Sequence, residues 1–343
     1  MTTKTKSPIE ALYLRLKNEV GLSKIFIKAK ILPEWWDDEI ADNQTGYAEA
    51  VGYIAKHTGI IFDSLMDVNY PITFPNIATR FYKSNELSEA DIDLAKKIAI
   101  GVADLIASAI KKPYLPIPKN YIEIRESVLK SEHSVFFQSL LNWCWSHGIA
   151  VISIRNFPKG AKKMKAMISF TKENPVIVLC DGHQYNAWLL FHLVHEIGHL
   201  ALGHVEVGRE LIDTDIKNPL HEYVIEQNNN NTLLMQEEKE ATLFGTGIIT
   251  GDPDMVYQSN SHLSSKQLAE RAIKIAKEQL TDPGFIALNY AWHKNFIPVG
   301  MGALRIIETD PDAHGLIKKT FLQNIDTDRL PDESLSYIQR IIG

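Results

Sequence analysis

The sequence predicts an α+β protein that is mainly helical, with a small mixed sheet in the middle of the chain. Apolar residues recur every three or four positions over most of residues 8–112, which is typical of amphipathic helices. Three short strand-like runs, 149–154, 166–170 and 176–180, then precede an almost wholly apolar helical stretch. A few consecutive strands with helices before and after them indicate the α+β class.

The first 112 residues are expected to form a helical N-terminal domain. Segments 8–20, 47–57 and 88–112 carry the helical period most clearly. Between the first two, Pro33 precedes residues 34–39, in which two tryptophans stand among acidic residues.

Three prolines within residues 113–120 predict a linker, after which residues 121–290 are expected to form a second domain. Its first helix is predicted over residues 131–146, ahead of the three strands. Because the third strand comes just before the apolar helix, we expect Val176–Cys180 at the sheet edge, where an extended peptide could add as another strand. Residues 291–343 are expected to form a helical C-terminal region.

The composition places the chain among ordinary globular proteins, with 45% apolar and 23% charged residues. The first twenty residues lack the apolar core of a signal peptide, so none is expected. The apolar run around 187–202 contains three histidines and a glutamate, which argues against a membrane span. Two cysteines alone fit a reducing cytoplasm. The net charge of −6 disfavours bulk nucleic-acid binding.

The most informative residues run from His195 to His199 and form the pattern H-E-x-x-H. At about 100° per residue, and with His195 at zero, His199 falls at about 40°, His192 at about 60° and Glu196 at about 100°. These ionisable side chains share one stripe of a helix that is otherwise almost entirely apolar. Two imidazoles so placed can bind one zinc ion, with the glutamate beside the open coordination position.

The alternative interpretation is a pair of core histidines that hydrogen-bond to their neighbours. Burial of ionisable groups is costly unless they are paired or metal-bound. The spacing of the residues and the apolar character of the helix together favour a metal site.

A catalytic zinc usually has three protein ligands and one water, so a third ligand must come from elsewhere in the chain. Glu206 and Glu210 follow His199 too closely to return easily to the metal. Residues 233–249 read as a second helix that could pack against the first and aim a carboxylate at the metal. The candidates on that helix are Glu237, Glu238 and Glu240, and the helical pattern alone leaves the choice open.

The segment HEIGHLALGH is followed by a later E-x-x-A-x-x-F on a predicted helix. This pair of motifs resembles the ImmA/IrrE metallopeptidases. In that family the third ligand is the glutamate three residues before the alanine of a segment E-x-x-A-N-x-F-A. The resemblance puts Glu238 at this position, with Ala241 and Phe244 in register. The sequence departs from the family pattern at Thr242, which replaces Asn, and at Gly245, which replaces Ala.

The resemblance covers about residues 120–290 and implies a zincin-like peptidase core that holds one Zn²⁺. It implies that His195, His199 and Glu238 bind the metal. Glu196 would deprotonate the bound water and later pass the proton to the leaving amine. The implied activity is cleavage of a regulatory protein, typically a transcriptional repressor, in a stress, mobile-element or phage-related response.

Residues 47–67 are similar to the last helices of XRE-type helix-turn-helix domains, which longer members of the family often carry. Residues 1–70 hold eight Lys or Arg and ten Asp or Glu, a net charge of −2 that is poor for gripping phosphates. We therefore expect a degenerate domain used for protein contact in preference to DNA binding.

Further side chains are candidates for contact with the metal ligands or with substrate. His192 lies on the metal stripe one turn before His195, and His204 stands at the end of the helix. The candidate stabilisers of a developing oxyanion are Tyr185, His221 and Tyr223.

The first hypothesis is therefore a cytoplasmic zinc endopeptidase that acts on a protein substrate and has no membrane partner. The second is an antitoxin-like binding module or transcriptional regulator whose zinc site is structural or vestigial. A zinc hydrolase that is not a peptidase is a third, because the H-E-x-x-H face does not distinguish it.

Overall fold

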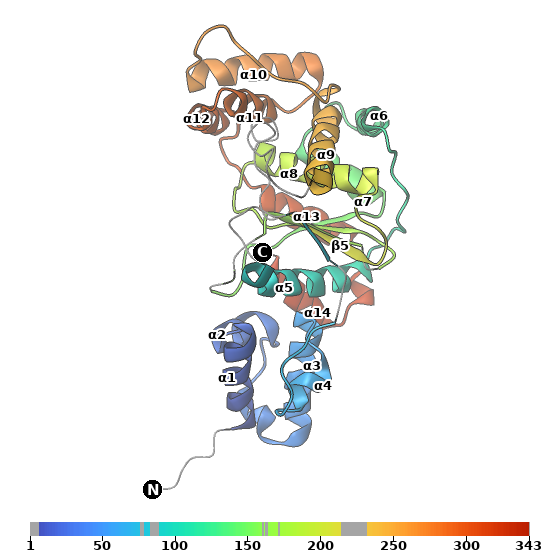
Figure 1. The fold of residues 1–343 in the computed structure, drawn as a ribbon, viewed down its shortest axis with the longest axis vertical. Helices are drawn as coiled ribbons and strands as arrows, with labels where there is room; N and C mark the ends of the chain where they lie inside the picture. The colour runs from blue at the N-terminus through green and yellow to red at the C-terminus, as the bar shows by residue number, and fades with distance from the viewer. Residues whose placement is uncertain are drawn as a thin grey trace.

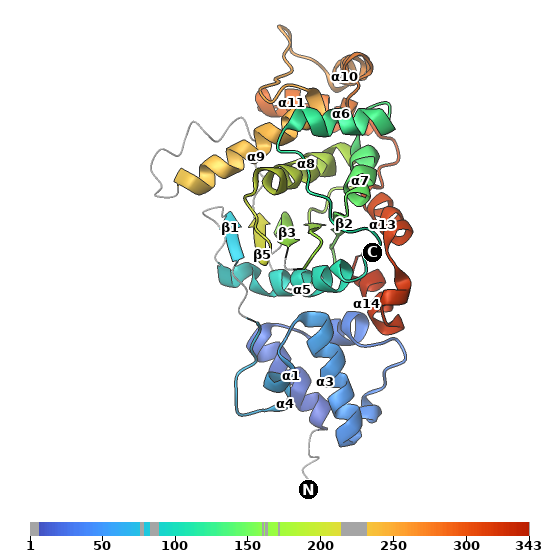
Figure 2. The same ribbon diagram turned by 90° about the vertical axis from the view of Figure 1, so that its right-hand side faces the viewer.

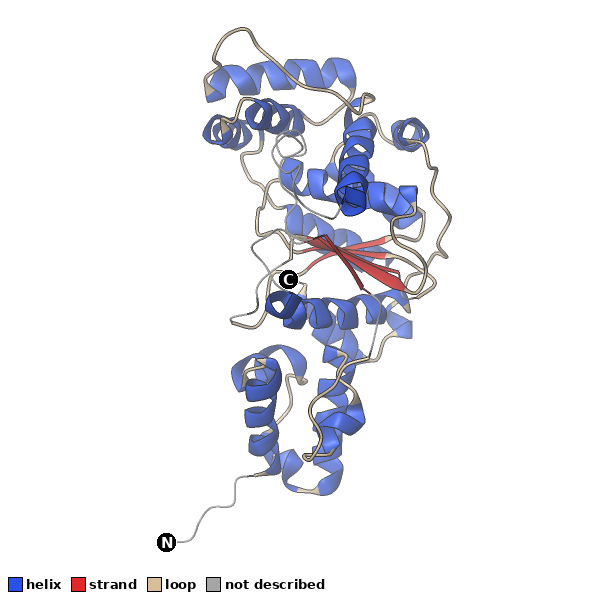
Figure 3. Ribbon diagram, in the orientation of Figure 1, coloured by secondary structure: helices blue, strands red, loops and turns tan. Residues whose placement is uncertain are grey.

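The computed structural model places a small sheet between helical layers, with further helices at both ends of the molecule (Figures 1 and 3). This arrangement confirms the α+β class with a mainly helical chain and a small mixed sheet. The structure describes residues 7–75, 79–82, 89–159, 161, 164–170, 172–213 and 232–342.

The N-terminal part is a group of short helices, and local signals explain where they end. Gly21 closes the first helix in the left-handed conformation, with φ of 77°. Asn43 begins the longest one by accepting a hydrogen bond from the backbone N–H of Gly46. The elements are α1 (Pro8–Val20), α2 (Lys24–Phe26), η1 (Ile27–Ile31), η2 (Asp38–Asp42), α3 (Gln44–Thr58) and α4 (Phe62–Met66).

The sheet has the strand order β1-β5-β3-β4-β2. Strand β3 is antiparallel to both of its neighbours, whereas β1 is parallel to β5 and β2 is parallel to β4. The strands are β1 (Thr79–Tyr82), β2 (Ala150–Ser153), β3 (Ala166–Phe170), β4 (Val176–Leu179) and β5 (Arg209–Asp213).

The expectation that Val176–Cys180 forms a sheet edge is wrong. Strand β4 lies between β3 and β2 and is hydrogen-bonded on both sides. Every residue of the strand is buried, and its unbroken apolar run VIVL is typical of a strand covered on both faces. An added peptide strand therefore has no place beside β4.

Each face of the sheet has its own hydrophobic core. Side chains alternate along β4: Ile177 and Leu179 join the core under α8 (Asn186–Leu202), whereas Val176 and Val178 face the opposite core. Helix α5 (Glu89–Ala107) lies on that opposite face, and α8 lies on the first (Figure 2). The second core is continuous with the N-terminal helices and with the last helix of the chain.

Helix α8 is packed against α7 (Phe137–Ser146), α9 (Thr232–Thr250) and α11 (Pro283–His293), and the last helix of the chain returns to the N-terminal part. The predicted helix 131–146 begins only at Phe137, because a break after Ser131 separates it from the preceding helix. Among the described helices, none is both long enough and apolar enough to cross a membrane. The remaining elements are α6 (Tyr121–Ser131), α7 (Phe137–Ser146), α9 (Thr232–Thr250), α10 (Ser265–Gln279), α11 (Pro283–His293), α12 (Ile297–Ile307), α13 (Ala313–Asn324), η3 (Thr327–Arg329) and α14 (Asp332–Ile341).

Helix α14 connects the end of the chain to its beginning. The ring of Tyr337 stacks on that of His57 at 4.2 Å, and its hydroxyl donates to the His57 carbonyl. Arg340 donates to the carbonyl of Leu32 at 2.8 Å. Residues far apart in sequence thus hold the N-terminal helices against the body of the molecule.

Two glycines allow α8 and α9 to cross closely. A Cβ atom on Gly198 would lie 2.5 Å from the Ala241 carbonyl oxygen and 2.9 Å from its Cα. A Cβ on Gly245 would lie 2.9 Å from the Val194 side chain and 3.0 Å from its backbone. The backbones therefore approach more closely than most side chains would permit.

We predict that Gly198→Ala lowers the free energy of unfolding by about 1–3 kcal/mol, because the new methyl group must push α9 away. Urea unfolding monitored by circular dichroism measures the effect. The matched control is Gly52→Ala within α3, where an added Cβ meets nothing within 4 Å. That change should stabilise the protein by up to about 1 kcal/mol, as Ala does in a helix. Equal stability of Gly198→Ala and wild type would contradict the close crossing.

Candidate metal centre

Helix α8 carries the H-E-x-x-H residues and is held at both ends. The carboxylate of Glu308 accepts hydrogen bonds from the backbone N–H groups of Asn186 and Ala187, at 2.7 and 3.1 Å. These bonds satisfy donors that a helix N-terminus otherwise leaves without partners. Gly203 ends the helix in the left-handed conformation, with φ of 78°. The helix between them is buried nearly all round, so the positions of its histidines are fixed by packing.

The two motif histidines and one glutamate of α9 converge on a common point. The Nε2 atoms of His195 and His199 lie 3.0 Å apart. The carboxylate of Glu238 lies 3.3 Å from the first and 3.0 Å from the second. Each residue offers one ligand atom, and the three atoms all lie within 4.8 Å of one another. The cluster could therefore hold a metal ion.

The spacing and chemistry of these three side chains fit a metal. Zinc–ligand bonds of about 2.0–2.2 Å in a tetrahedron would place neighbouring ligand atoms about 3.3–3.5 Å apart. The separations here are close to those values, and both histidines are at most 1% exposed. Two imidazoles and a carboxylate are also a donor set typical of catalytic zinc.

The two neighbouring glutamates are placed differently from Glu238. Glu240 lies 3.5 Å from the Nε2 of His204 and accepts a hydrogen bond from Gln236. Neither Glu237 nor Glu240 belongs to the metal-binding group found among the described residues. Of the three candidates on this helix, the structure brings Glu238 to the histidines.

Glu196 is fully buried beside this cluster. Within the part of the chain that the structure describes, neither of its carboxylate oxygens has a hydrogen-bond partner. Burial and the nearby carboxylates of Asp213 and Glu238 raise the pKa of Glu196 well above its usual value. A carboxyl group with this property can hold a proton near neutral pH.

Asp213 is a residue of this site that the sequence analysis missed. It is the last residue of β5, is 1% exposed, and has its Oδ2 3.4 Å from the Nε2 of His195. Burial would lower the pKa of His195, but the carboxylates of Glu238 and Asp213 outweigh it and raise that pKa. The sequence held one signal that could have identified Asp213: it is an acidic residue at the end of the first strand after the metal helix.

Thr242 takes part in the site although it departs from the family pattern. The Nδ1 of His195 lies 3.0 Å from its hydroxyl oxygen, and both groups are buried. If Nε2 faces a metal, the ring proton is on Nδ1 and donates to this oxygen. Threonine thus supplies an oxygen acceptor, as an asparagine side chain could.

The other candidate residues lie at different distances from the cluster. The Nδ1 of His204 lies 2.9 Å from the Nδ1 of His199, so His204 contacts a ligand residue directly. Tyr185 immediately precedes α8, and no contact of its side chain with the cluster is found in the described structure. His221 and Tyr223 lie outside the described residues.

His192 faces a second buried carboxylate instead of the metal cluster. Its Nε2 lies 3.5 Å from Asp181, which also binds Lys165 at 2.8 Å and His183 at 2.6 Å. Burial would raise the pKa of Asp181, but hydrogen bonds from His183 and Lys165 and the nearby ring of His192 outweigh it and hold that pKa well below its usual range. The Asp181 carboxylate is therefore an ionised anchor between β4 and α8.

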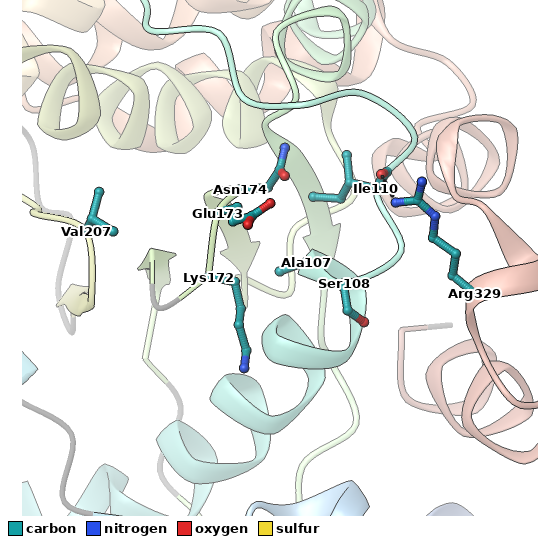
Figure 4. A pocket seen from close by; sticks show the side chains of 8 residues that line it. All are labelled: Ala107, Ser108, Ile110, Lys172, Glu173, Asn174, Val207 and Arg329. Carbon is teal, nitrogen blue, oxygen red and sulfur yellow. Dashed lines mark hydrogen bonds between the residues drawn. The ribbon is translucent and has the colours of Figure 1, made fainter.

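A pocket of about 510 Å³ lies away from this centre (Figure 4). Its lining includes Ser108, Lys172, Asn174 and Arg329, from the end of α5, the turn between β3 and β4, and the residues before α14. None of its lining residues belongs to the metal cluster.

No protein-family model, curated protein or solved structure matches this chain. The fold and the side-chain cluster therefore define it only as an α+β protein with a candidate metal centre of two histidines and one glutamate.

We predict that Thr242→Val weakens metal binding about tenfold, because His195 loses the acceptor that orients its ring. Competition with a chromophoric chelator measures the affinity. Thr246→Val is the matched control, since the Thr246 hydroxyl donates to the backbone carbonyl of Thr242, one turn earlier in α9. Equal affinity of the two variants would show that the Thr242 contact does not orient the ligand.

Proposed function

We propose that this chain is a zinc-dependent endopeptidase. The observation that carries the proposal is the convergence of His195, His199 and Glu238 beside the unpartnered buried carboxylate of Glu196. Three ligands leave one coordination position for water, and a free carboxylate next to that position can serve as a base. Two helices that merely packed together in a core would not need four ionisable groups at one point.

The residues would divide the reaction between them. His195, His199 and Glu238 would hold Zn²⁺, which supplies Lewis-acid activation of water and of a carbonyl oxygen. Glu196 would take a proton from the attacking water and deliver it to the leaving amine. Its burial suits this role, because a carboxyl shielded from water can keep the proton between the two transfers. Asp213 would keep the site strongly negative, which favours a divalent cation.

The proposed substrate is a regulatory protein, such as a transcriptional repressor, cleaved in a stress, mobile-element or phage-related response. This substrate class rests on the resemblance to ImmA/IrrE metallopeptidases within residues 120–290. We place the reaction in the cytoplasm, since Cys144 and Cys180 are both buried and are not joined by a disulfide.

Protein contact is also the role that we propose for the N-terminal helices. Residues 33–53 contain six Asp or Glu and no Lys or Arg, a composition that is poor for binding phosphates. Trp35 is 54% exposed within this stretch and forms an edge contact with Tyr53. An exposed tryptophan is a frequent anchor of protein interfaces.

One observation favours a second candidate, a regulator or antitoxin-like module with a structural metal. The two histidine ligands and Glu196 are at most 1% exposed, and structural zinc sites are closed. Hydrolysis, measured separately from metal content, distinguishes the two functions.

We predict that wild-type protein binds about one zinc per chain and that Glu238→Ala loses most of it, because a two-histidine site is weak. Elemental analysis after dialysis measures the stoichiometry. Glu237→Ala, one residue away on the same helix, is the matched control and should keep the metal. Loss of zinc from Glu237→Ala with retention in Glu238→Ala would reassign the third ligand.

We predict that Glu196→Gln keeps zinc but loses hydrolysis by about 10²–10⁴-fold, since the amide cannot accept the proton. Digestion of a mixed peptide library, read by mass spectrometry, reports cleavage. Glu206→Gln makes the same chemical change at an exposed position just after the helix and should leave the rate unchanged. A zinc-loaded wild type that cleaves nothing, or a Glu196→Gln variant as fast as wild type, would overturn the mechanism.

A further inference from the structure

The two histidine ligands differ in what lies behind them. The Nδ1 of His195 faces the neutral hydroxyl of Thr242 at 3.0 Å. The Nδ1 of His199 faces another imidazole, the Nδ1 of His204, at 2.9 Å. Both ligands present Nε2 to the cluster, so each Nδ1 is the atom that must carry the ring proton when a metal is bound.

His204 is folded back onto the helix that precedes it. Gly203 adopts the left-handed conformation, and the next backbone N–H, that of His204, donates to the His199 carbonyl at 3.0 Å. The side chain of His204 is thereby buried, with only 7% exposure. Its position is set by the turn that ends α8.

The contact between the two rings determines which nitrogens carry protons. If the Nδ1–H of His199 donates, the Nδ1 of His204 must be the acceptor and its proton must be on Nε2. That Nε2 lies 3.5 Å from the Oε2 of Glu240, an anion that attracts the N–H. The second oxygen of Glu240 accepts a hydrogen bond from Gln236 at 2.7 Å, which orients the carboxylate.

We propose that His204 and Glu240 are positioning residues that fix the tautomer of His199 and strengthen it as a metal ligand. In this arrangement the Nδ1–H of His199 points to His204 and the Nε2–H of His204 points to Glu240. Both N–H groups therefore point away from the metal. A carboxylate behind a ligating histidine raises the basicity of the ligand atom, and here one imidazole transmits the effect. This inference rests on the proposed metal site but not on peptide hydrolysis.

The contact also joins three parts of the fold. His199 is on α8, His204 follows its C-terminus, and Glu240 is on α9, two residues after the ligand Glu238. Helices α8 and α9 therefore meet through Glu238 on the metal side and through Glu240 on the outer side. The same helix that contributes a ligand also orients another one.

We call the series of contacts from His199 through His204 to Glu240 the relay. Measurements of zinc affinity and of histidine tautomers in the full-length protein test it. We expect His204→Phe to weaken zinc binding about 10–100-fold, as loss of a contact to a ligating histidine does. His204→Asn should recover part of that loss, because its carbonyl oxygen can replace Nδ1 as acceptor. Glu240→Gln should weaken binding in wild type but have no effect in His204→Phe, whose ring has no N–H to face Glu240.

Long-range ¹H–¹⁵N spectra of the zinc-loaded protein provide a second readout, with protons expected on Nδ1 of His199 and Nε2 of His204. Glu206→Gln is the control for a change of surface charge. Full zinc affinity in His204→Phe, or a proton on Nδ1 of His204, would overturn the relay alone. The expected affinities without any peptide cleavage would sustain the relay and refute the peptidase. A wild type that binds no zinc would remove both.

Discussion

The candidate metal centre depends on the close crossing of α8 and α9. Gly198 lies within the H-E-x-x-H motif itself and packs against the backbone of Ala241, while Gly245 packs against Val194. This approach brings a largely buried glutamate on α9 to within 3.3 Å of two buried imidazoles on α8. Side chains on either glycine would separate the helices, and the third ligand would then lie too far away. Ligand geometry is here a consequence of helix packing.

The charges at the crossing explain why a cation suits this place. Glu196, Glu238 and Asp213 bring three carboxyl groups to one buried point, where burial favours their neutral forms. In the metal-free chain, the carboxylates raise the pKa of His195 and Glu196 takes up a proton readily. A divalent ion would replace these protons and satisfy the same negative groups, so metal binding and proton release are linked.

The two ends of the chain pack on the face of the sheet opposite α8. The N-terminal helices, α5 and α14 share one core with side chains of β2, β3, β4 and β5. Stacking of Tyr337 on His57 and the bonds from Arg340 to the backbone near Leu32 join the two termini. The sheet that positions Asp213 is therefore buried on both faces, which makes its strands rigid supports for the site.

The sequence by itself determined the secondary structure around the motif and two residues of the candidate metal centre, because periodicity and spacing are local properties. The helix predicted over 187–202 is observed at Asn186–Leu202, and the strand predicted over 166–170 has those bounds. The position of β4 inside the sheet, and the presence of Asp213 beside His195, were decided by the tertiary structure. Strand order and contacts between distant segments depend on which apolar faces pack together, and no local pattern records that pairing.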